Sequence, residues 1–212
     1  MDLTRIGITP AVLAAAQARG GSGELPARVS AVHKERYALL CERGECYARL
    51  KASTYYSAQT EEFPTTGDFV LVQYNESGDS VIAHTLPRRS YFARRNPTLG
   101  EGAQAVAANF DSVFVMQSLN LDFNPRRLER YLALAWQSGA TPVVVLTKSD
   151  LVEDCSAQLF EAQRTAAGAD VFAVSALTGA GMSALSPYLA SGKTVVLLGS
   201  SGVGKSSFVN AL

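Results

Sequence analysis

The segment Gly199-Ser200-Ser201-Gly202-Val203-Gly204-Lys205-Ser206 matches the pattern G-x-x-x-x-G-K-S of a phosphate-binding loop. The preceding stretch, Thr194-Val195-Val196-Leu197-Leu198, is β-branched and apolar and predicts a buried strand over 194–198. The residues after the loop predict a helix. A plain glycine-rich turn is the alternative, and it is disfavoured because strand, loop and helix occur in the required order.

The chemistry of this loop predicts a nucleoside triphosphate as its ligand. Its glycines allow a tight turn that aims consecutive backbone N–H groups inward, as a nest for phosphate. We expect Lys205 to reach the β- and γ-phosphates as the catalytic cation, and the hydroxyl of Ser206 to ligate Mg²⁺. The expected nucleotide contacts come from Gly199, Ser200, Ser201, Gly202, Val203, Gly204, Lys205, Ser206 and Ser207.

A second element predicts which base is bound. An apolar stretch from Val143 ends in Thr147-Lys148-Ser149-Asp150, close to the N-K-x-D element of GTPases. Asp150 can accept hydrogen bonds from guanine N1–H and N2–H₂ together, whereas adenine would leave the carboxylate unpaired at a cost of about 1–3 kcal/mol. The stem of Lys148 can lie across the purine, and the hydroxyl of Thr147 can tie this segment to the phosphate loop. A solvated turn is the alternative reading of T-K-S-D taken alone.

A third element follows a further predicted strand at 170–174. It is Ser175-Ala176-Leu177, followed by Thr178-Gly179-Ala180-Gly181. These residues are similar to the S-A-K/L segment of GTPases, in which a backbone N–H faces guanine O6. The spacing from T-K-S-D fits one helix, expected at about 157 to 167. We therefore expect Ser175, Ala176 and Leu177 to line the base site.

The order of the three elements is permuted. Ordinary GTPases begin with the phosphate loop, whereas here the two base-reading elements come first and the phosphate loop comes last. All three lie on loops at the carboxyl ends of parallel strands, so the site does not depend on where the chain opens. The sequence therefore predicts a circularly permuted P-loop domain.

In this order the motifs resemble the circularly permuted GTPases that assist assembly of the bacterial small ribosomal subunit, the RsgA/YjeQ family. The resemblance also includes Gly67-Asp68-Phe69-Val70, Pro87-Arg88-Arg89-Ser90 with Arg94-Arg95, Asn109-Phe110-Asp111-Ser112-Val113 and Asn124-Pro125-Arg126-Arg127-Leu128-Glu129-Arg130-Tyr131-Leu132. It implies an N-terminal OB-fold, a central permuted GTPase domain and a C-terminal zinc-binding domain. It further implies GTP hydrolysis stimulated by the small ribosomal subunit, with GTP/GDP and Mg²⁺ as ligands, and contact with ribosomal RNA. We expect a cytoplasmic protein that binds neither DNA nor a membrane, since no segment reaches the ~20 apolar residues needed to span a bilayer.

The sequence stops at Leu212, inside the helix after the phosphate loop. The switch segments and zinc ligands of the family are therefore not among these residues. From this we expect these 212 residues alone to bind nucleotide weakly or not at all, without turnover.

Composition agrees with a globular chain of one to two domains. The 212 residues are 47% hydrophobic, and 19 basic and 19 acidic residues give a formal net charge of zero. Bulk charge therefore gives no sign of nucleic-acid binding, which would need a local patch. Three cysteines suit a reducing cytosol. Cys41, Cys46 and His33 suggest a metal site, but a plain structural role in neighbouring strands is favoured.

The predicted fold class is a multi-domain β plus α/β protein. Residues 1–24 are expected to be a helix and linker, 25–87 an OB-fold, and 88–212 the permuted and incomplete GTPase domain. Thr9-Pro10 begins the helix, which is read as a surface helix rather than a signal peptide. Five segments of alternating polarity predict the barrel strands, at 27–33, 36–41, 45–51, 68–74 and 80–85.

Aromatic and basic residues of the barrel suggest an RNA-binding face. The candidates are Tyr37, Tyr47, Tyr55 and Tyr56, with Lys34, Arg36, Arg49 and Lys51. Ordinary outward-facing side chains are the alternative, and the resemblance favours RNA. The cluster Arg88, Arg89, Arg94 and Arg95 could contact phosphate or merely solvate a linker.

The second domain is expected to alternate strands and helices, with further strands at 111–118 and 142–147. Asn124-Pro125 begins a helix that ends at Gly139, and Leu128, Tyr131, Leu132, Ala135 and Trp136 are expected to form its core stripe. Asp122 and Glu129 are interpreted as solvated helix-end charges. Two other functions remain open, an ATP-using P-loop phosphotransferase and an RNA-binding module with an inert P-loop half.

Overall fold

The computed structural model describes residues 1–34, 36–51, 63–95, 103–120, 122–166 and 168–212. The chain divides into two compact units, Met1–Phe110 with Ser191–Lys193, and Asp111–Ala190 with Thr194–Leu212. The expected domain boundary at 87/88 falls inside the first unit. The paired strands β6 (Tyr91–Arg95) and β7 (Ala103–Ala108) lie between that position and the end of the first unit.

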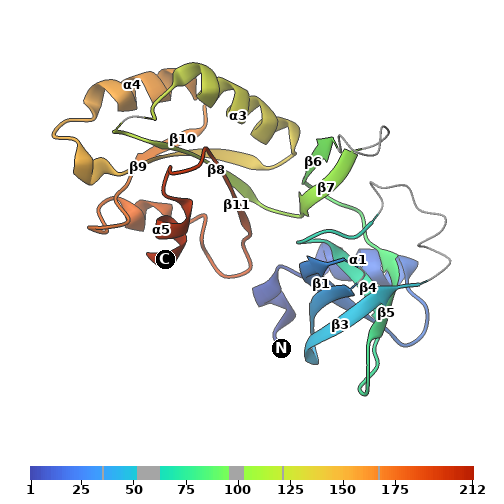
Figure 1. Cartoon of the computed structure of the whole chain (residues 1–212). Helices are drawn as coiled ribbons and strands as arrows, with labels where there is room; N and C mark the ends of the chain where they lie inside the picture. Colours follow the sequence, from blue (N-terminus) through green and yellow to red (C-terminus); the bar gives the residue numbers. More distant parts are fainter. Residues whose placement is uncertain (35, 52–62, 96–102, 121, 167) are drawn as a thin grey trace. The chain divides into compact units, whose positions relative to one another are not determined.

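Five strands of the first unit form a closed barrel (Figure 1). They are β1 (Glu24–His33), β2 (Arg36–Cys41), β3 (Gly44–Leu50), β4 (Phe69–Gln73) and β5 (Ser80–Thr85). Their order around the barrel is β1-β2-β3-β5-β4, and only the β3–β5 pair is parallel. The five-stranded barrel expected of an OB-fold is confirmed, with strand bounds within a few residues of those expected.

Alternation along the strands places one face of each strand in the barrel core. Val29 of β1, Leu39 of β2, Val70 of β4 and Ile82 of β5 are among its buried residues. Cys41 belongs to the same core and Cys46 packs against it. Burial and the neighbouring Cys41 thiol raise the pKa of Cys46 to about 11, so the Cys46 thiol stays protonated near neutral pH.

The N-terminal segment covers one part of the barrel. A short 3₁₀ turn, η1 (Leu3–Ile6), leads into helix α1 (Pro10–Arg19). The hydroxyl of Thr9 accepts the Val12 N–H at 3.4 Å, which is the expected N-cap. The helix packs against Phe69, Leu71 and Leu86 of the barrel through buried Ala16 and half-buried Val12 and Leu13, so the expected surface helix has one apolar face.

A buried polar cluster joins distant segments of the first unit. Arg28 of β1 donates to the carbonyls of Ile6 at 2.7 Å, Gly67 at 3.3 Å and Asn109 at 3.0 Å. Asp68 is fully buried and pairs with Arg88 at 2.7 Å. Motifs that carry the family resemblance, G-D-F-V, P-R-R-S and N-F-D, thus meet in one structural cluster.

The second unit is built on a parallel sheet ordered β10-β9-β8-β11. Its strands are β8 (Ser112–Ser118), β9 (Thr141–Thr147), β10 (Asp170–Ala173) and β11 (Val195–Leu198). Helices α3 (Pro125–Gln137) and α4 (Ser156–Thr165) cover one face and α5 (Lys205–Asn210) lies on the other (Figure 1). Among the described residues, the 3₁₀ turns are η1, given above, η3 (Ser149–Leu151) and η4 (Met182–Leu185).

Both faces of this sheet are apolar, as a sheet covered on two sides requires. Phe114, Met116, Val143 and Val145 pack with Phe208 of α5 in one cluster. On α3, Leu128, Leu132 and Ala135 are buried as expected. The expectation that Trp136 belongs to this stripe is wrong, since it is 50% exposed.

Candidate nucleotide-binding site

The predicted phosphate loop connects β11 to α5. Gly202 and Gly204 have φ of 78° and 100°, the left-handed backbone that favours glycine. A Cβ at Gly199 would lie 2.7 Å from the Met116 carbonyl oxygen, so the loop leaves the sheet in close contact with β8. The sequence pattern thus folds into the strand, loop and helix that a phosphate cradle needs.

Lys205 lies across this loop. Its Nζ donates to the carbonyl oxygens of Gly199 at 2.8 Å and Ser200 at 2.7 Å. These two bonds hold the ammonium group beside the loop, where a phosphate chain would meet it. Ser206 and Ser207 follow in the first turn of α5, and both side chains are exposed.

The T-K-S-D segment contacts the phosphate loop directly. The Thr147 hydroxyl donates to the Val203 carbonyl at 2.6 Å, and Lys148 Nζ donates to the Gly202 carbonyl at 2.9 Å. Lys148 itself adopts a left-handed φ of 61°, which turns the chain sharply at the end of β9. The expected tie between Thr147 and the phosphate loop is therefore confirmed, and Lys148 adds a second.

The S-A-L segment contacts the other end of T-K-S-D. The Ser175 hydroxyl donates to Asp150 Oδ1 at 2.5 Å, and the Ser149 N–H donates to the Val174 carbonyl at 3.1 Å. Ser175 is fully buried, whereas Leu177 is 84% exposed at the tip of its turn. Three segments far apart in sequence thus form one continuous site at the carboxyl edge of β9, β10 and β11.

One residue of this site was misread from the sequence. Asp122 is not a solvated helix-end charge, because its Oδ2 accepts the Ser200 hydroxyl at 2.6 Å and its Oδ1 pairs with Arg127 at 2.7 Å. The available signal was its position just after β8, beside the edge where β11 also ends. The reading of Glu129 as an exposed helix charge agrees with the structure.

The proposed RNA face of the barrel is smaller than the sequence suggested. Tyr37 is 5% exposed and belongs to the barrel core, so its expected stacking role is wrong. Tyr47 is 47% exposed, and the Arg36 guanidinium lies over its ring at 4.1 Å. Hydrogen bonds from Arg36 and Arg49 hold the pKa of Asp79 below its usual range. Tyr55 and Tyr56 lie outside the described residues.

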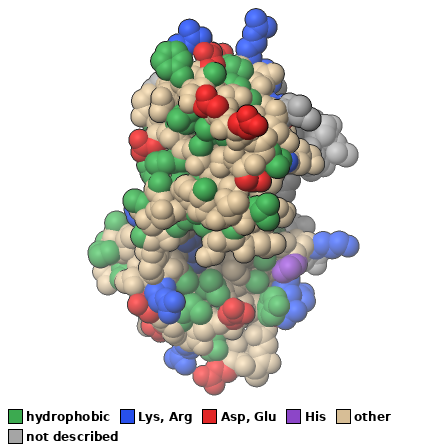
Figure 2. All heavy atoms as spheres, turned by 90° about the vertical axis from the view of Figure 1, so that its left-hand side faces the viewer, with side chains coloured by type: hydrophobic (Ala, Val, Ile, Leu, Met, Phe, Trp, Pro, Cys, Tyr) green, Lys and Arg blue, Asp and Glu red, His purple; other side chains and the backbone are tan. Residues whose placement is uncertain are grey.

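The second basic cluster is also partly structural. The guanidinium of Arg88 pairs with buried Asp68 at 2.7 Å, so neither phosphate contact nor a solvated linker describes this residue. Arg89 donates weakly to the Asn109 carbonyl at 3.4 Å, and the side chains of Arg94 and Arg95 lie outside the described part. Figure 2 shows basic and acidic side chains interspersed on the face it draws.

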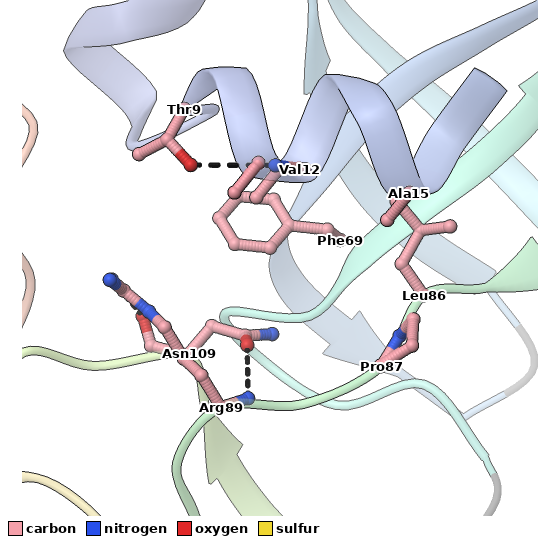
Figure 3. Close-up of a pocket in the computed structure, with 9 residues that line it drawn as sticks. Thr9, Val12, Ala15, Phe69, Leu86, Pro87, Arg89 and Asn109 are labelled. Atoms are coloured by element: carbon pink, nitrogen blue, oxygen red, sulfur yellow. Dashed lines mark hydrogen bonds between the residues drawn. The ribbon is translucent and has the colours of Figure 1, made fainter. Parts of the chain in front are cut away.

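A separate pocket of about 230 Å³ lies between α1 and the barrel (Figure 3). Val12 and Ala15 of the helix face Phe69 and Leu86, and Arg89 and Asn109 lie on its other side. None of the three predicted nucleotide-binding segments lines it.

In the described ranges, no group of three or more His, Cys, Asp or Glu side chains could hold a metal ion. Likewise, no helix in the part of the chain that the structure describes has the length and apolar character to cross a membrane.

The fold and the site define a circularly permuted P-loop domain joined to a small β-barrel. The sequence model of the RsgA GTPase family matches residues 85–212. The chain therefore belongs to the RsgA GTPase family.

Relatives and solved structures agree with this family. The chain is 45% identical over 185 residues to small ribosomal subunit biogenesis GTPase RsgA 1 of Listeria monocytogenes, covering 87% of this chain and 52% of that protein. It is 38% identical to RsgA 2 of Lactiplantibacillus plantarum, covering 100% of this chain and 60% of that protein. YjeQ from Thermotoga maritima has a TM-score of 0.70 at 25% identity, over 89% of this chain and 64% of that chain.

A second solved structure, YloQ, described as a circularly permuted GTPase, has a TM-score of 0.66 at 22% identity, over 91% of this chain and 66% of that chain. The permuted fold expected from motif order is thus confirmed. The chain spans about half the length of the curated relatives it matches.

Proposed function

We propose that this chain binds guanine nucleotides with Mg²⁺ and supplies the nucleotide-reading part of a GTPase that acts in biogenesis of the small ribosomal subunit in the cytoplasm. The observation that carries the proposal is the pair of bonds from Thr147 and Lys148 to the phosphate loop, continued by the Ser175–Asp150 bond. These contacts support a single ligand that spans a base site and a phosphate site.

Different residues of the site would contact the base and the phosphates of the nucleotide. Asp150 keeps Oδ2 and part of Oδ1 for guanine N1–H and N2–H₂, while the Ser175 hydroxyl orients its carboxylate. The stem of Lys148 and the exposed side chain of Leu177 offer apolar contact to the purine. Gly199–Ser206 provides backbone N–H groups, and Lys205 a positive charge, for the phosphates.

A magnesium ion fits the donor set at the phosphate end. The exposed Ser206 hydroxyl is a hard oxygen ligand beside the phosphate loop, and Mg²⁺ usually combines one or two such ligands with phosphate oxygens and water. Bound there, the ion would neutralise negative charge on the phosphates. The chain's own contribution to hydrolysis is positioning and electrostatic stabilisation by Lys205 and the loop amides.

We assign ribosomal RNA contact to the β2–β3 face of the barrel. Tyr47 of β3 is exposed, and Arg36 and Arg49 lie beside it, held by their shared partner Asp79. This face and its adjoining loops are where OB-folds bind oligonucleotides. The names of the relatives, which refer to the small ribosomal subunit, support RNA of that particle as the partner.

Nucleotide binding is tested by titrating this chain with a fluorescent GDP analogue and displacing it with GDP or ADP. We expect displacement by GDP and none by ADP at equal concentration. Lys205→Ala should weaken binding about 10- to 100-fold, because it removes a charged hydrogen-bond donor to phosphate. Equal displacement by ADP would instead favour an ATP-using enzyme. Absence of binding to the wild-type chain is what the sequence alone leads us to expect of these 212 residues. It would overturn the proposal that they bind nucleotide and would favour an RNA-binding module with an inert P-loop half.

RNA contact is tested by sedimentation of the chain with purified small ribosomal subunits. Tyr47→Ala should lower the affinity about 5- to 150-fold, since one base–aromatic stack contributes about 1–3 kcal/mol. Tyr91→Ala is the matched control, because Tyr91 of β6 is 49% exposed in the same unit and lies off this face. If both variants bind alike, the β2–β3 face is not the contact.

A further inference from the structure

Asp122 connects the segment after β8 to the phosphate loop. Its Oδ2 accepts the Ser200 hydroxyl at 2.6 Å, and its Oδ1 pairs with Arg127 at 2.7 Å. The Asp122 and Arg127 side chains are 28% and 22% exposed, so the ion pair is largely shielded from solvent. Both carboxylate oxygens are therefore engaged, one with the loop and one with helix α3.

The position of Asp122 is fixed by its neighbours. Gln117 of β8 is fully buried, and its side-chain amide clamps the backbone of Asn124, accepting the N–H at 2.9 Å and donating to the carbonyl at 3.1 Å. Asn124 in turn caps α3 by accepting the Arg127 N–H at 3.0 Å. The Arg127 side chain then meets Asp122 from the first turn of this capped helix.

Ser200 is held at two points. Its hydroxyl donates to Asp122, and its carbonyl accepts the Lys205 ammonium at 2.7 Å. The residue that orients the phosphate-binding lysine is thus itself anchored by a carboxylate outside the phosphate-loop motif. Loss of that anchor leaves Ser200 free to rotate and shifts one of the two acceptors that hold Lys205.

We propose that Asp122 is a positioning residue for the phosphate loop, acting through Ser200 to hold the loop and Lys205 ready for the nucleotide phosphates. The proposal rests on the proposed function, because it assigns the phosphate end of that site a further member. In this proposal, Arg127 holds Asp122, and Asp122 holds Ser200 of the phosphate loop.

Charge repulsion alone predicts the opposite effect of removing Asp122 on nucleotide affinity. A carboxylate beside a phosphate site repels an anionic ligand, so its removal should tighten nucleotide binding, most at low salt. Positioning predicts that removal weakens binding. The direction of change therefore separates the two accounts, and a merely structural role for Asp122 would move stability without moving the affinity of folded protein.

The experiment compares Asp122→Ala, Asp122→Asn, Ser200→Ala and the Asp122→Ala/Ser200→Ala pair in this chain. We expect Asp122→Ala and Ser200→Ala each to weaken the fluorescent GDP analogue about tenfold. The double variant should bind the analogue no more weakly than either single variant, since each substitution removes the same Ser200–Asp122 hydrogen bond. Asp122→Asn keeps an acceptor for Ser200 and should recover part of the affinity. Glu129→Ala, an exposed acid of the same unit, is the control and should bind like wild type.

A second readout needs no nucleotide. Amide hydrogen exchange at 199–206 should quicken about tenfold in Asp122→Ala and Ser200→Ala, with exchange in β8 and β9 unchanged. If wild type fails to bind the analogue, the proposed function fails while exchange still tests the tether. Unchanged exchange in both variants, tighter binding by Asp122→Ala, or additive losses in the double variant would overturn the proposal.

Discussion

Asp150→Asn is expected to weaken GDP binding about 100-fold or more and to admit xanthosine diphosphate. The carboxylate accepts from two guanine donors, whereas an asparagine amide can accept from N1–H but would oppose its own NH₂ to the guanine N2–H₂. Xanthine carries a carbonyl oxygen at that position, which the asparagine NH₂ can reach as donor. The measurement is displacement of fluorescent GDP and XDP analogues by unlabelled nucleotides, at one magnesium concentration.

The structure supplies a matched control for this exchange of base preference. Asp154 lies on the same loop, and its carboxylate bonds only locally, to Ser156, among the described residues. Asp154→Asn should therefore leave the preference for GDP over XDP unchanged. A wild-type chain that binds ADP as well as GDP, or an Asp150→Asn chain that gains no affinity for XDP, would exclude Asp150 as the base-reading residue.

Gly67→Ala is expected to destabilise the barrel unit by about 3 kcal/mol or more. Gly67 has a φ of 92°, and an added Cβ would lie 2.1 Å from the Ala108 carbonyl oxygen. Left-handed backbone alone costs a residue with a side chain about 1–2 kcal/mol. The added clash is with backbone, so relieving it must move segments that the Arg28, Asp68 and Asn109 contacts hold together.

Gly44→Ala separates the cost of left-handed backbone from the cost of the clash. Gly44 has a φ of 106° but nothing within 4 Å of an added Cβ, so it bears the backbone strain without the clash. It should lose only about 1–2 kcal/mol. Urea unfolding of each unit can be followed separately. The NMR signals of both histidine rings (His33 and His84) report on the first unit, and the fluorescence of the single tryptophan (Trp136) reports on the second. Equal losses in Gly67→Ala and Gly44→Ala would contradict the close approach at Ala108.

Much of the fold and the site followed from local sequence. Strand alternation predicted the barrel, and apolar runs ending in T-K-S-D, S-A-L and G-S-S-G-V-G-K-S predicted the permuted sheet, because each signal is contained in a short window. The meeting of the three segments was predictable from their chemistry, because a base reader and a phosphate cradle must lie around one nucleotide. The contacts of Thr147 and Lys148 with the phosphate loop agree with that requirement.

Two predictions were wrong because the direction in which a side chain points from its strand or helix decides whether it is buried. Along β2, Tyr37, Leu39 and Cys41 are two residues apart, so their side chains share one face of the strand. That face is the barrel core. On α3, Trp136 follows Ala135 by one residue, about 100° further round the helix, which takes it off the buried stripe. In both cases residue type was given more weight than position.

The other differences depend on long-range contacts. Arg88 looked like one of four exposed arginines, but its partner Asp68 lies 20 residues away in sequence. The Ser200 hydroxyl that Asp122 holds lies 78 residues away. The first unit likewise extends to Phe110 because Asn109 bonds back to Arg28 and Gly67. Such pairs carry no local pattern, so single-sequence reasoning has no route to them.

The most direct test of one shared nucleotide pocket is an NMR titration of the isotope-labelled chain with GDP, guanosine and pyrophosphate. Guanosine should shift the amides of 147–150 and 175–177, pyrophosphate those of 199–206, and GDP both sets with one common saturation curve. ADP should shift the phosphate-loop amides only, and only at concentrations well above those at which GDP saturates. If GDP shifts only the phosphate-loop amides, or if the two sets saturate at different concentrations, Asp150 and Lys205 do not read the same nucleotide.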